Sequence, residues 1–400
     1  MNYLKLFMVA LALSVSSFAQ VDTSSQHFYM FIYFLNSNDQ AGARIALSSN
    51  AMNWQKINDE KPVLVPIISS EKRMRDPNTY YDSTTGTFHL VWTTGWNQQT
   101  IGYATSVDLK TWTPQVALPV GTKITGCTCC WAPEIFYDDI KDSFMVYWST
   151  DRGTNGKRTY YSLTKDFKTF SGPKKFFDPG YSVIDATILK DAAAKYYMFF
   201  KDERDVKDVP DNDKTKNIHY IVGKSPQGGG APDGFAKGTL DIGWSQISQA
   251  ITDVGCEGPS AIKINNQYLV YFDPFGVFSS TYRMVQTADL NTKTFPWPKG
   301  EVLKTSTGED FLYSHGSISE IPKAKVLQLL YGIADNTQYK ASFTPPVQNS
   351  DITVLTPPKE VLKYPLGKPN RGCGTGVGLA FFPPILFKAW SLRSRRKKKR

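Results

Sequence analysis

Five short segments of this 400-residue chain each carry a carboxylic acid or a histidine close to a proline or a small residue. The five residues are Asp76, Glu134, Asp185, Glu257 and His315, and they recur roughly every 50–70 positions. Paired carboxyl groups whose pKa values are pushed apart can supply the acid and the base that cleave a glycosidic bond. A single Asp-Pro or Glu-Gly-Pro is usually part of a turn, so the recurrence carries the signal rather than any one segment.

The chain between these residues follows one repeated plan. Each segment continues into a strand, a short turn and a second strand, which is rich in aromatic residues. We expect these second strands at 88–92, 144–148, 196–200, 268–272 and, in the fifth unit, 326–331. Alternating apolar and polar residues bounded by Gly, Asp and Asn are typical of strands joined by hairpins. The repeat therefore predicts an all-β chain.

The length of the repeat suits a four-stranded blade, so we predict a five-bladed β-propeller. The last unit, at 315–331, has no back half after it, whereas an orphan back half lies at 28–55. Strands from the N- and C-terminal parts would then close the ring, which removes an open sheet edge. The inner strands of a propeller run parallel around one axis. The five chemistry-bearing residues should therefore meet at one end of the ring.

Several acids in one concave site repel each other unless a cation, shared protons or a substrate relieves the repulsion. The ordered set of blade signatures resembles that of family 43 glycoside hydrolases, over about residues 28–340. The signatures are Arg75-Asp76-Pro77, Trp131-Ala132-Pro133-Glu134, Ile184-Asp185-Ala186-Thr187, Glu257-Gly258-Pro259-Ser260 and His315-Gly316-Ser317.

This resemblance implies a five-bladed propeller that hydrolyses arabinose- or xylose-containing polysaccharides with inversion of the anomeric centre. Carried over by motif, Asp76 would be the general base, Asp185 the group that tunes and orients the acid, and Glu257 the general acid. The chemistry would need no cofactor, although His315 would lie near a calcium ion or a water cluster on the axis. Arg75 stands where many members have a small residue, and the cysteines near Trp131 and Glu257 lie outside the family pattern.

Three further residues are candidates for substrate binding. Trp131 could stack on a sugar ring or pack between blades. Glu134 could bind sugar hydroxyls, although a structural role is favoured. Arg75 could contact substrate, but pairing with a neighbouring acid is favoured. The charged run at 201–205 is interpreted as a solvated loop.

The composition excludes some other functions. With 41% hydrophobic and 20% charged residues the chain is globular. Its net charge of +10 comes largely from the last eight residues, seven of which are basic. The remainder is close to neutral, so no nucleic-acid-binding face is indicated.

We expect three parts: a secretory signal peptide at 1–19, a propeller catalytic domain at 20–370 and an atypical basic tail at 371–400. No segment beyond the leader reaches the ~18–20 apolar residues of a membrane span. The protein is expected to be a monomer. Five cysteines permit structural disulfides in a secreted chain but leave at least one unpaired, and the connectivity stays open.

The leading hypothesis is thus a secreted, inverting glycoside hydrolase of the α-L-arabinofuranosidase or β-xylosidase type. The alternative is a non-catalytic propeller that binds carbohydrate. A fructan-active relative is less favoured, because that group has its Asp nucleophile in an Asn-Asp-Pro context and its Arg-Asp-Pro in a later blade.

Overall fold

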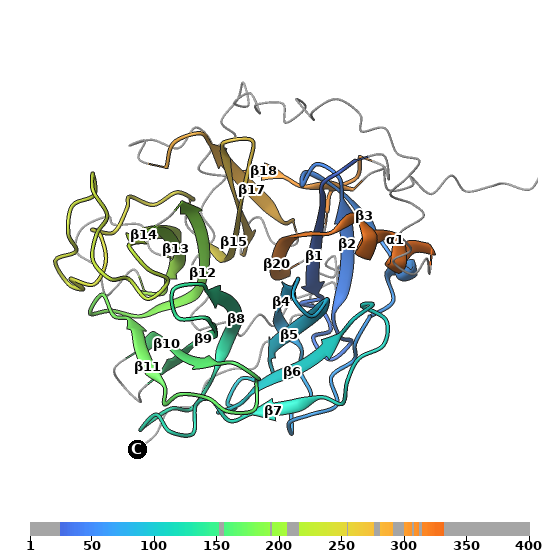
Figure 1. The fold of residues 1–400 in the computed structure, drawn as a ribbon, viewed down its shortest axis with the longest axis horizontal. Coiled ribbons are helices and arrows are strands. Elements are labelled where there is room, and N and C mark those ends of the chain that lie inside the picture. The colour runs from blue at the N-terminus through green and yellow to red at the C-terminus, as the bar shows by residue number, and fades with distance from the viewer. Residues whose placement is uncertain are drawn as a thin grey trace, which may run out of the picture. The chain divides into compact units, whose positions relative to one another are not determined.

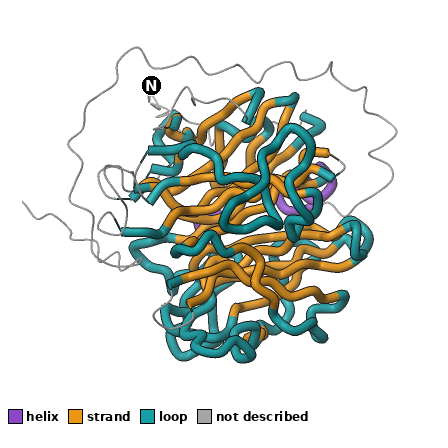
Figure 2. The backbone as a smooth tube through the Cα atoms, turned by 90° about the vertical axis from the view of Figure 1, so that its left-hand side faces the viewer, coloured by secondary structure: helices purple, strands orange, loops and turns teal. Residues whose placement is uncertain are grey.

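The computed structural model describes residues 25–331 except 152–155, 193, 206–215, 254, 276–280, 291–299, 306–307 and 312–313. The expected leader at 1–19 and tail at 371–400 lie outside the described residues. Within them, the regular structure is almost entirely strand, as Figure 2 shows. The one α-helix among them, α1 (Lys323–Tyr331), is too short to cross a membrane.

The described strands form five sheets. Four of them follow chain order outward from the ring axis. Blade one contains β4 (Arg75–Asp82), β5 (Thr87–Thr93), β6 (Ile101–Ser106) and β7 (Val116–Leu118). Blade two contains β8 (Trp131–Asp138), β9 (Ser143–Asp151), β10 (Lys157–Thr164) and β11 (Lys174–Phe177). Blade three contains β12 (Val183–Ala192), β13 (Lys195–Asp202) and β14 (Ile218–Gly223). Blade four contains β15 (Cys256–Ile264), β16 (Gln267–Pro274), β17 (Arg283–Thr287) and β18 (Glu301–Val302).

The fifth sheet closes the ring with strands from both ends of the described chain. Its order is β20 (Ser314–Ile321), β1 (Phe28–Phe34), β2 (Arg44–Ser48), β3 (Asn53–Lys56) and β19 (Lys304–Thr305). The innermost strands β4, β8, β12, β15 and β20 contact one another in a closed cycle, which can be followed in Figure 1. The prediction of a five-bladed β-propeller closed in this way is confirmed.

One expected strand is wrong. Residues 326–331 were predicted as the second strand of the last blade, but they belong to α1. The place beside β20 is taken by the fully buried aromatic strand β1. Seven of the nine residues of α1 are Lys, Ala, Leu or Gln, which favour helix, and the helix packs Val326 and Leu329 into the core between blades five and one.

Apolar side chains fill the spaces between neighbouring blades. Five hydrophobic clusters of buried residues lie there, one at each junction between adjacent blades. Trp92, Trp148 and Trp244 are fully buried in three of them. Because burial of a large apolar side chain contributes ~1.5–3 kcal/mol, the aromatic second strands stabilise the ring that positions the inner strands.

The inner strands of blades one to four share a β-bulge close to their first residues. We name three sites at this bulge: the paired position before it, the bulge position, and the return position where pairing resumes. The paired positions are Arg75, Trp131, Ile184 and Glu257, and the return positions are Asn78, Glu134, Thr187 and Ser260. The bulge positions Asp76, Ala132, Asp185 and Gly258 all have positive φ, between 44° and 57°.

The signature residues do not hold matching places in this register. Asp76 and Asp185 are equivalent, but Glu257 lies one residue earlier and Glu134 two residues later in their blades. Residues at different register positions can still converge, because the bulge redirects the strand where it occurs.

Hydrogen bonds between blades explain the small polar residues of the signatures. The N–H groups of Ala132, Asp185 and His315 donate to Thr93 Oγ1 (2.8 Å), Ser149 Oγ (3.2 Å) and Asp273 Oδ2 (3.1 Å) of the preceding blade. A second set of bonds joins the return positions: Ile135 N–H donates to Asn78 Oδ1, Ile318 N–H to Ser260 Oγ and Thr79 N–H to Ser317 Oγ. The same pattern places His315 at the bulge position of blade five.

Candidate active site

The three predicted catalytic acids converge at one end of the inner strands, around two buried cations. His315 Nδ1 lies 3.2 Å from Asp76 Oδ1. Lys201 Nζ donates to Glu257 Oε2 at 2.7 Å. Asp185 Oδ2 accepts the N–H of Gly258 at 3.1 Å, and Asp185 interacts electrostatically with the members of both pairs. The side chains of Asp76 and Glu257 remain 11% and 19% exposed, so solvent reaches this cluster.

Asp76 is held as a carboxylate. Burial alone would raise its pKa, but the charge and hydrogen bond of His315, the charge of Arg75 and the hydroxyl of Thr93 lower it to about 2. Thr93 Oγ1 donates to Asp76 Oδ2 at 2.8 Å. An ionised carboxylate with a fixed orientation is suited to accept a proton from water.

His315 is held as an imidazolium. Burial would lower its pKa, but the carboxylates of Asp76 and Asp185, the hydrogen bond to Asp76 and the carboxylate of Glu257 raise it to about 9.

Asp185 differs from Asp76 although the two hold equivalent positions. Burial raises the pKa of Asp185, and the charges of Glu257 and Asp76 add to this rise, while His315 and Lys201 oppose it. Its side chain therefore takes up a proton far more readily than that of Asp76.

Lys201 was predicted in a solvated loop, and this interpretation is wrong. Lys201, Asp202 and Glu203 are only 3%, 0% and 7% exposed. Lys201 is the penultimate residue of β13, where it lies between Glu257 and Glu203, whose Oε2 is 3.0 Å from Nζ. These carboxylates, together with Asp185, raise the pKa of Lys201 against the effect of burial, so its ammonium group persists inside the ring.

Two other buried acids surround the cluster. Burial raises the pKa of Glu134 to about 7, although Tyr147 OH donates to its Oε2 at 2.5 Å. Burial and the charge of Glu257 raise the pKa of Asp273 to about 7. Glu134 is 8% exposed and occupies a return position, where the other blades use Asn, Thr or Ser.

Trp131 and Arg75 occupy paired positions of neighbouring blades, beside Trp96. The indole N–H of Trp131 donates to the carbonyl of Trp96 at 2.9 Å, and Lys157 Nζ lies 4.3 Å from the centre of the Trp131 ring. The Arg75 guanidinium lies 4.5 Å from the centre of the Trp96 ring and pairs with Asp39 at 3.3 Å.

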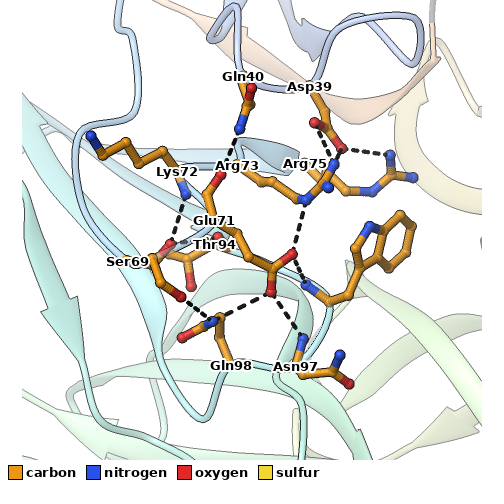
Figure 3. Close-up of polar contacts among 12 residues, drawn as sticks. Asp39, Gln40, Ser69, Glu71, Lys72, Arg73, Arg75, Thr94, Asn97 and Gln98 are labelled. Carbon is orange, nitrogen blue, oxygen red and sulfur yellow. Dashed lines mark hydrogen bonds and ion pairs between the residues drawn. The ribbon is translucent and has the colours of Figure 1, made fainter.

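A polar network links Asp39, Arg73, Arg75 and Glu71, as Figure 3 shows. Arg73 and Arg75 both point at Asp39. The carboxylate of Glu71 accepts bonds from Arg73 and from the N–H groups of Trp96 and Asn97. Glu71 thereby fixes the loop that carries Trp96, against which Trp131 rests.

The predicted calcium ion near His315 would need oxygen ligands close to the imidazole. No group of three or more His, Cys, Asp or Glu side chains within the described ranges is arranged to hold a metal. His315 Nδ1 itself lies against Asp76 Oδ1 at 3.2 Å. We therefore assign no chemical step to a metal ion, and calcium stays a prediction.

Sequence reasoning missed Lys201 and Asp273, which belong to the second strands rather than to the signatures. A signal was present: each stands at the end of an apolar run, opposite the paired position of its own blade. A charged residue that ends an otherwise buried strand faces the ring axis here and not solvent.

Comparison with known proteins agrees with this architecture. Residues 25–326 match the model of a family 43-related group described as "Probable glycosyl hydrolase domain". An α-L-arabinofuranosidase of Bifidobacterium longum subsp. longum is 28% identical over 200 residues, which are 43% of this chain but only 18% of that relative.

Solved structures with a similar fold include a thermostable family-43 glycoside hydrolase, with 16% identity, a TM-score of 0.43 and coverage of 57% of this chain and 73% of that one. An α-L-arabinofuranosidase from Lactobacillus brevis has 16% identity, a TM-score of 0.41 and coverage of 56% and 73%. Likeness at this level does not bear on the substrate. The family match spans most of the chain, and this protein belongs to the family 43-related glycoside hydrolases.

Proposed function

We propose that this protein is a secreted, inverting glycoside hydrolase that removes arabinofuranosyl or xylosyl units from polysaccharides. The observation that carries the proposal is the convergence of Asp76, Asp185 and Glu257 around His315 and Lys201. The arabinofuranosidase relative supports the choice of sugar, although the match covers only a part of that protein.

In the proposed reaction, Asp76 takes a proton from a water molecule as that water attacks the anomeric carbon. Glu257 gives its proton to the leaving glycosidic oxygen on the opposite side of the sugar, and the anomeric configuration inverts. Such a pair of carboxyl groups stands roughly 6.5–9.5 Å apart to leave room for the water. Asp185, close to Glu257 through the Gly258 N–H, tunes and orients the acid.

The contact between Lys201 and Glu257 favours a second candidate, the non-catalytic carbohydrate-binding propeller. Lys201 Nζ donates to Glu257 Oε2 at 2.7 Å and so engages an oxygen that would have to face a leaving group. Catalytic hydrogen bonds often form only in the substrate complex. Hydrolysis therefore requires that bound substrate change the contact between Lys201 and Glu257.

A panel of nitrophenyl arabinofuranoside, xyloside and galactofuranoside, together with arabinan, tests the activity. NMR detection of the first product anomer tests the stereochemistry. Hydrolysis with an inverted product is expected. A retained configuration would refute the water-mediated mechanism, and sugar binding without turnover on any substrate would favour the second candidate.

Variants separate the roles of the two acids. Glu257→Ala should lose ~10²–10⁴-fold in rate on a substrate with a poor leaving group but much less on a dinitrophenyl glycoside, which needs no proton. Asp76→Asn should lose activity on both. Glu320→Gln, at an exposed position toward the other end of β20, is the matched control and should keep full activity. Equal losses for Glu257→Ala on both substrates would contradict its assignment as the acid.

Export, the monomeric state and calcium are further parts of the proposal. N-terminal sequencing of the exported protein should find residue 20 first, and size-exclusion chromatography should give a single-chain mass. Activity that falls on chelation and returns with calcium would support an ion on the axis.

A further inference from the structure

Three buried cysteines lie on the loop that leads into β8. Cys127, Cys129 and Cys130 are 3%, 2% and 0% exposed. Cys127 Sγ and Cys130 Sγ are 3.9 Å apart. Cys256, the other described cysteine, packs in the core between blades three and four, whereas Cys127 and Cys130 pack between blades one and two. The proximity of the two sulfur atoms therefore singles out one pair.

The surroundings of the two sulfur atoms hold them on one side of the loop. A Cβ atom added to Gly121 would lie 2.5 Å from Cys130 Sγ and 2.6 Å from Cys127 Sγ, so both sulfur atoms pack against this glycine. Thr150 Oγ1 donates to Cys127 Sγ at 3.0 Å. The Cys127 carbonyl accepts a bond from the Gln99 side chain at 2.7 Å, which fixes the backbone at this end of the pair.

We propose that Cys127 and Cys130 form an intrachain disulfide that fastens the loop in front of β8. The oxidant is a disulfide of another molecule, either the oxidised form of a small thiol compound or the disulfide of a thiol-exchange protein. The thiolate of Cys127 attacks this disulfide, and one thiol leaves. The sulfur of Cys130 then loses its proton and attacks Cys127 Sγ, and the second thiol leaves. Two protein thiols are oxidised and one external disulfide is reduced.

The packed loop gives the two thiols different environments. The Cys130 hydrogen bond and, next to it, Thr150 lower the pKa of Cys127 to about 7 against the effect of burial. Burial raises the pKa of Cys130 well above its ordinary value. Both side chains are almost inaccessible in the folded chain, so the exchange takes place before this loop has packed.

The position of the disulfide connects it to the candidate active site. Trp131 follows Cys130 directly and rests against Trp96. Thr128, inside the loop, donates from its N–H and its hydroxyl to Asp151 at 2.8 Å and 2.5 Å. Closing the link between 127 and 130 restricts the backbone immediately before Trp131.

Mapping of the cysteines in the full chain tests the proposal without any activity measurement. The chain is folded in a glutathione redox buffer, denatured, and blocked with iodoacetamide, and it is then reduced and labelled with N-ethylmaleimide. All three cysteines fall in the tryptic peptide 124–141, so fragmentation assigns each label. We expect maleimide on Cys127 and Cys130 and iodoacetamide on Cys129. Maleimide on Cys129, or none in this peptide at any glutathione ratio, would overturn the pairing.

Variants give a second readout. Reduction should lower the melting temperature of the wild type and of Cys129→Ser by a few degrees, and it should leave Cys127→Ser unchanged. A wild type whose melting temperature does not respond to reduction would refute the fastening role. Because neither readout uses substrate, failure of this proposal is distinct from failure of the proposed hydrolase function.

Discussion

Replacement of Glu134 by Gln should stabilise the protein at alkaline pH and leave its stability almost unchanged in acid. The pKa of Glu134 is about 7 in the folded protein, against an ordinary 4.5 in the unfolded chain. Below pH 4.5 the carboxyl is protonated in both states and favours neither. Between 4.5 and 7 only the unfolded chain releases the proton, so the free energy of unfolding falls as the pH rises.

The size of this effect follows from the two pKa values. A difference between 4.5 and about 7 corresponds to about 3 kcal/mol, at about 1.36 kcal/mol per pH unit. Gln has the same shape, cannot ionise, and still accepts the hydrogen bond from Tyr147. Glu134→Gln should therefore gain about 3 kcal/mol over the wild type at pH 8.5 and nearly nothing at pH 4.5.

Urea unfolding of both proteins at the two pH values measures the effect. Glu320→Gln, which makes the same replacement at a side chain that is 59% exposed, is the control. If Glu134→Gln is destabilised to the same extent at both pH values, the carboxyl is not a buried charge above pH 7 and the reasoning is refuted.

Three other substitutions test the site. Lys201→Met should lower the free energy of unfolding by ~3–5 kcal/mol in urea titrations, because it removes the lysine that pairs with Glu257 and one of the lysines that pair with Glu203, whereas Lys201→Arg should cost much less. Gly258→Ala should abolish most activity, because φ is +57° and the new Cβ would lie 2.4 Å from His315 Cγ; Ala132→Gly, at the same bulge position of blade two, is the control and should retain activity. His315→Gln should move the acidic limb of the pH profile of kcat/KM to higher pH by ~1 unit, because Asp76 loses the cation beside it. An unchanged limb would show that the ionisation of Asp76 does not determine its position.

The sequence predicts the ring but not its register. The blades can be recognised in the sequence because a strand of alternating apolar and polar residues, followed by a second strand rich in aromatic residues, recurs along the chain. An alignment of the units on their acids puts blades two and four out of register with blades one and three. Asp76 and Asp185 hold the bulge position, whereas Glu134 and Glu257 do not. Pro77, Pro133 and Pro259 all directly follow the bulge position and would have given the correct alignment. Proline lacks the N–H that a ladder needs, so it is tolerated at such an unpaired place.

The fifth blade shows a second limit. The apolar residues at 326, 327, 329 and 330 follow the spacing of a helix face rather than the alternation of a strand. Their assignment as a strand came from analogy with the other units. The place beside β20 is taken by β1, and such competition between distant segments is not visible locally.

Lys201 accounts for the different position of the acid in blade four. Thr93, Ser149 and Asp273 each stand opposite a paired position and accept the N–H of the next blade's bulge residue. Lys201 holds the same place in blade three but can only donate. The carboxylate of Glu257, one residue before the bulge position of blade four, accepts a hydrogen bond from the Lys201 ammonium group.

The bulge N–H of blade four, which belongs to Gly258, must then find another acceptor, and it donates to Asp185 Oδ2. Asp185 is thus drawn toward Glu257 by the absence of the usual acceptor, and two acids that would otherwise repel are joined through one lysine and one backbone N–H. If this is the origin of the arrangement, Lys201 positions both acids, and its removal must alter the chemistry at Asp185 as well as at Glu257.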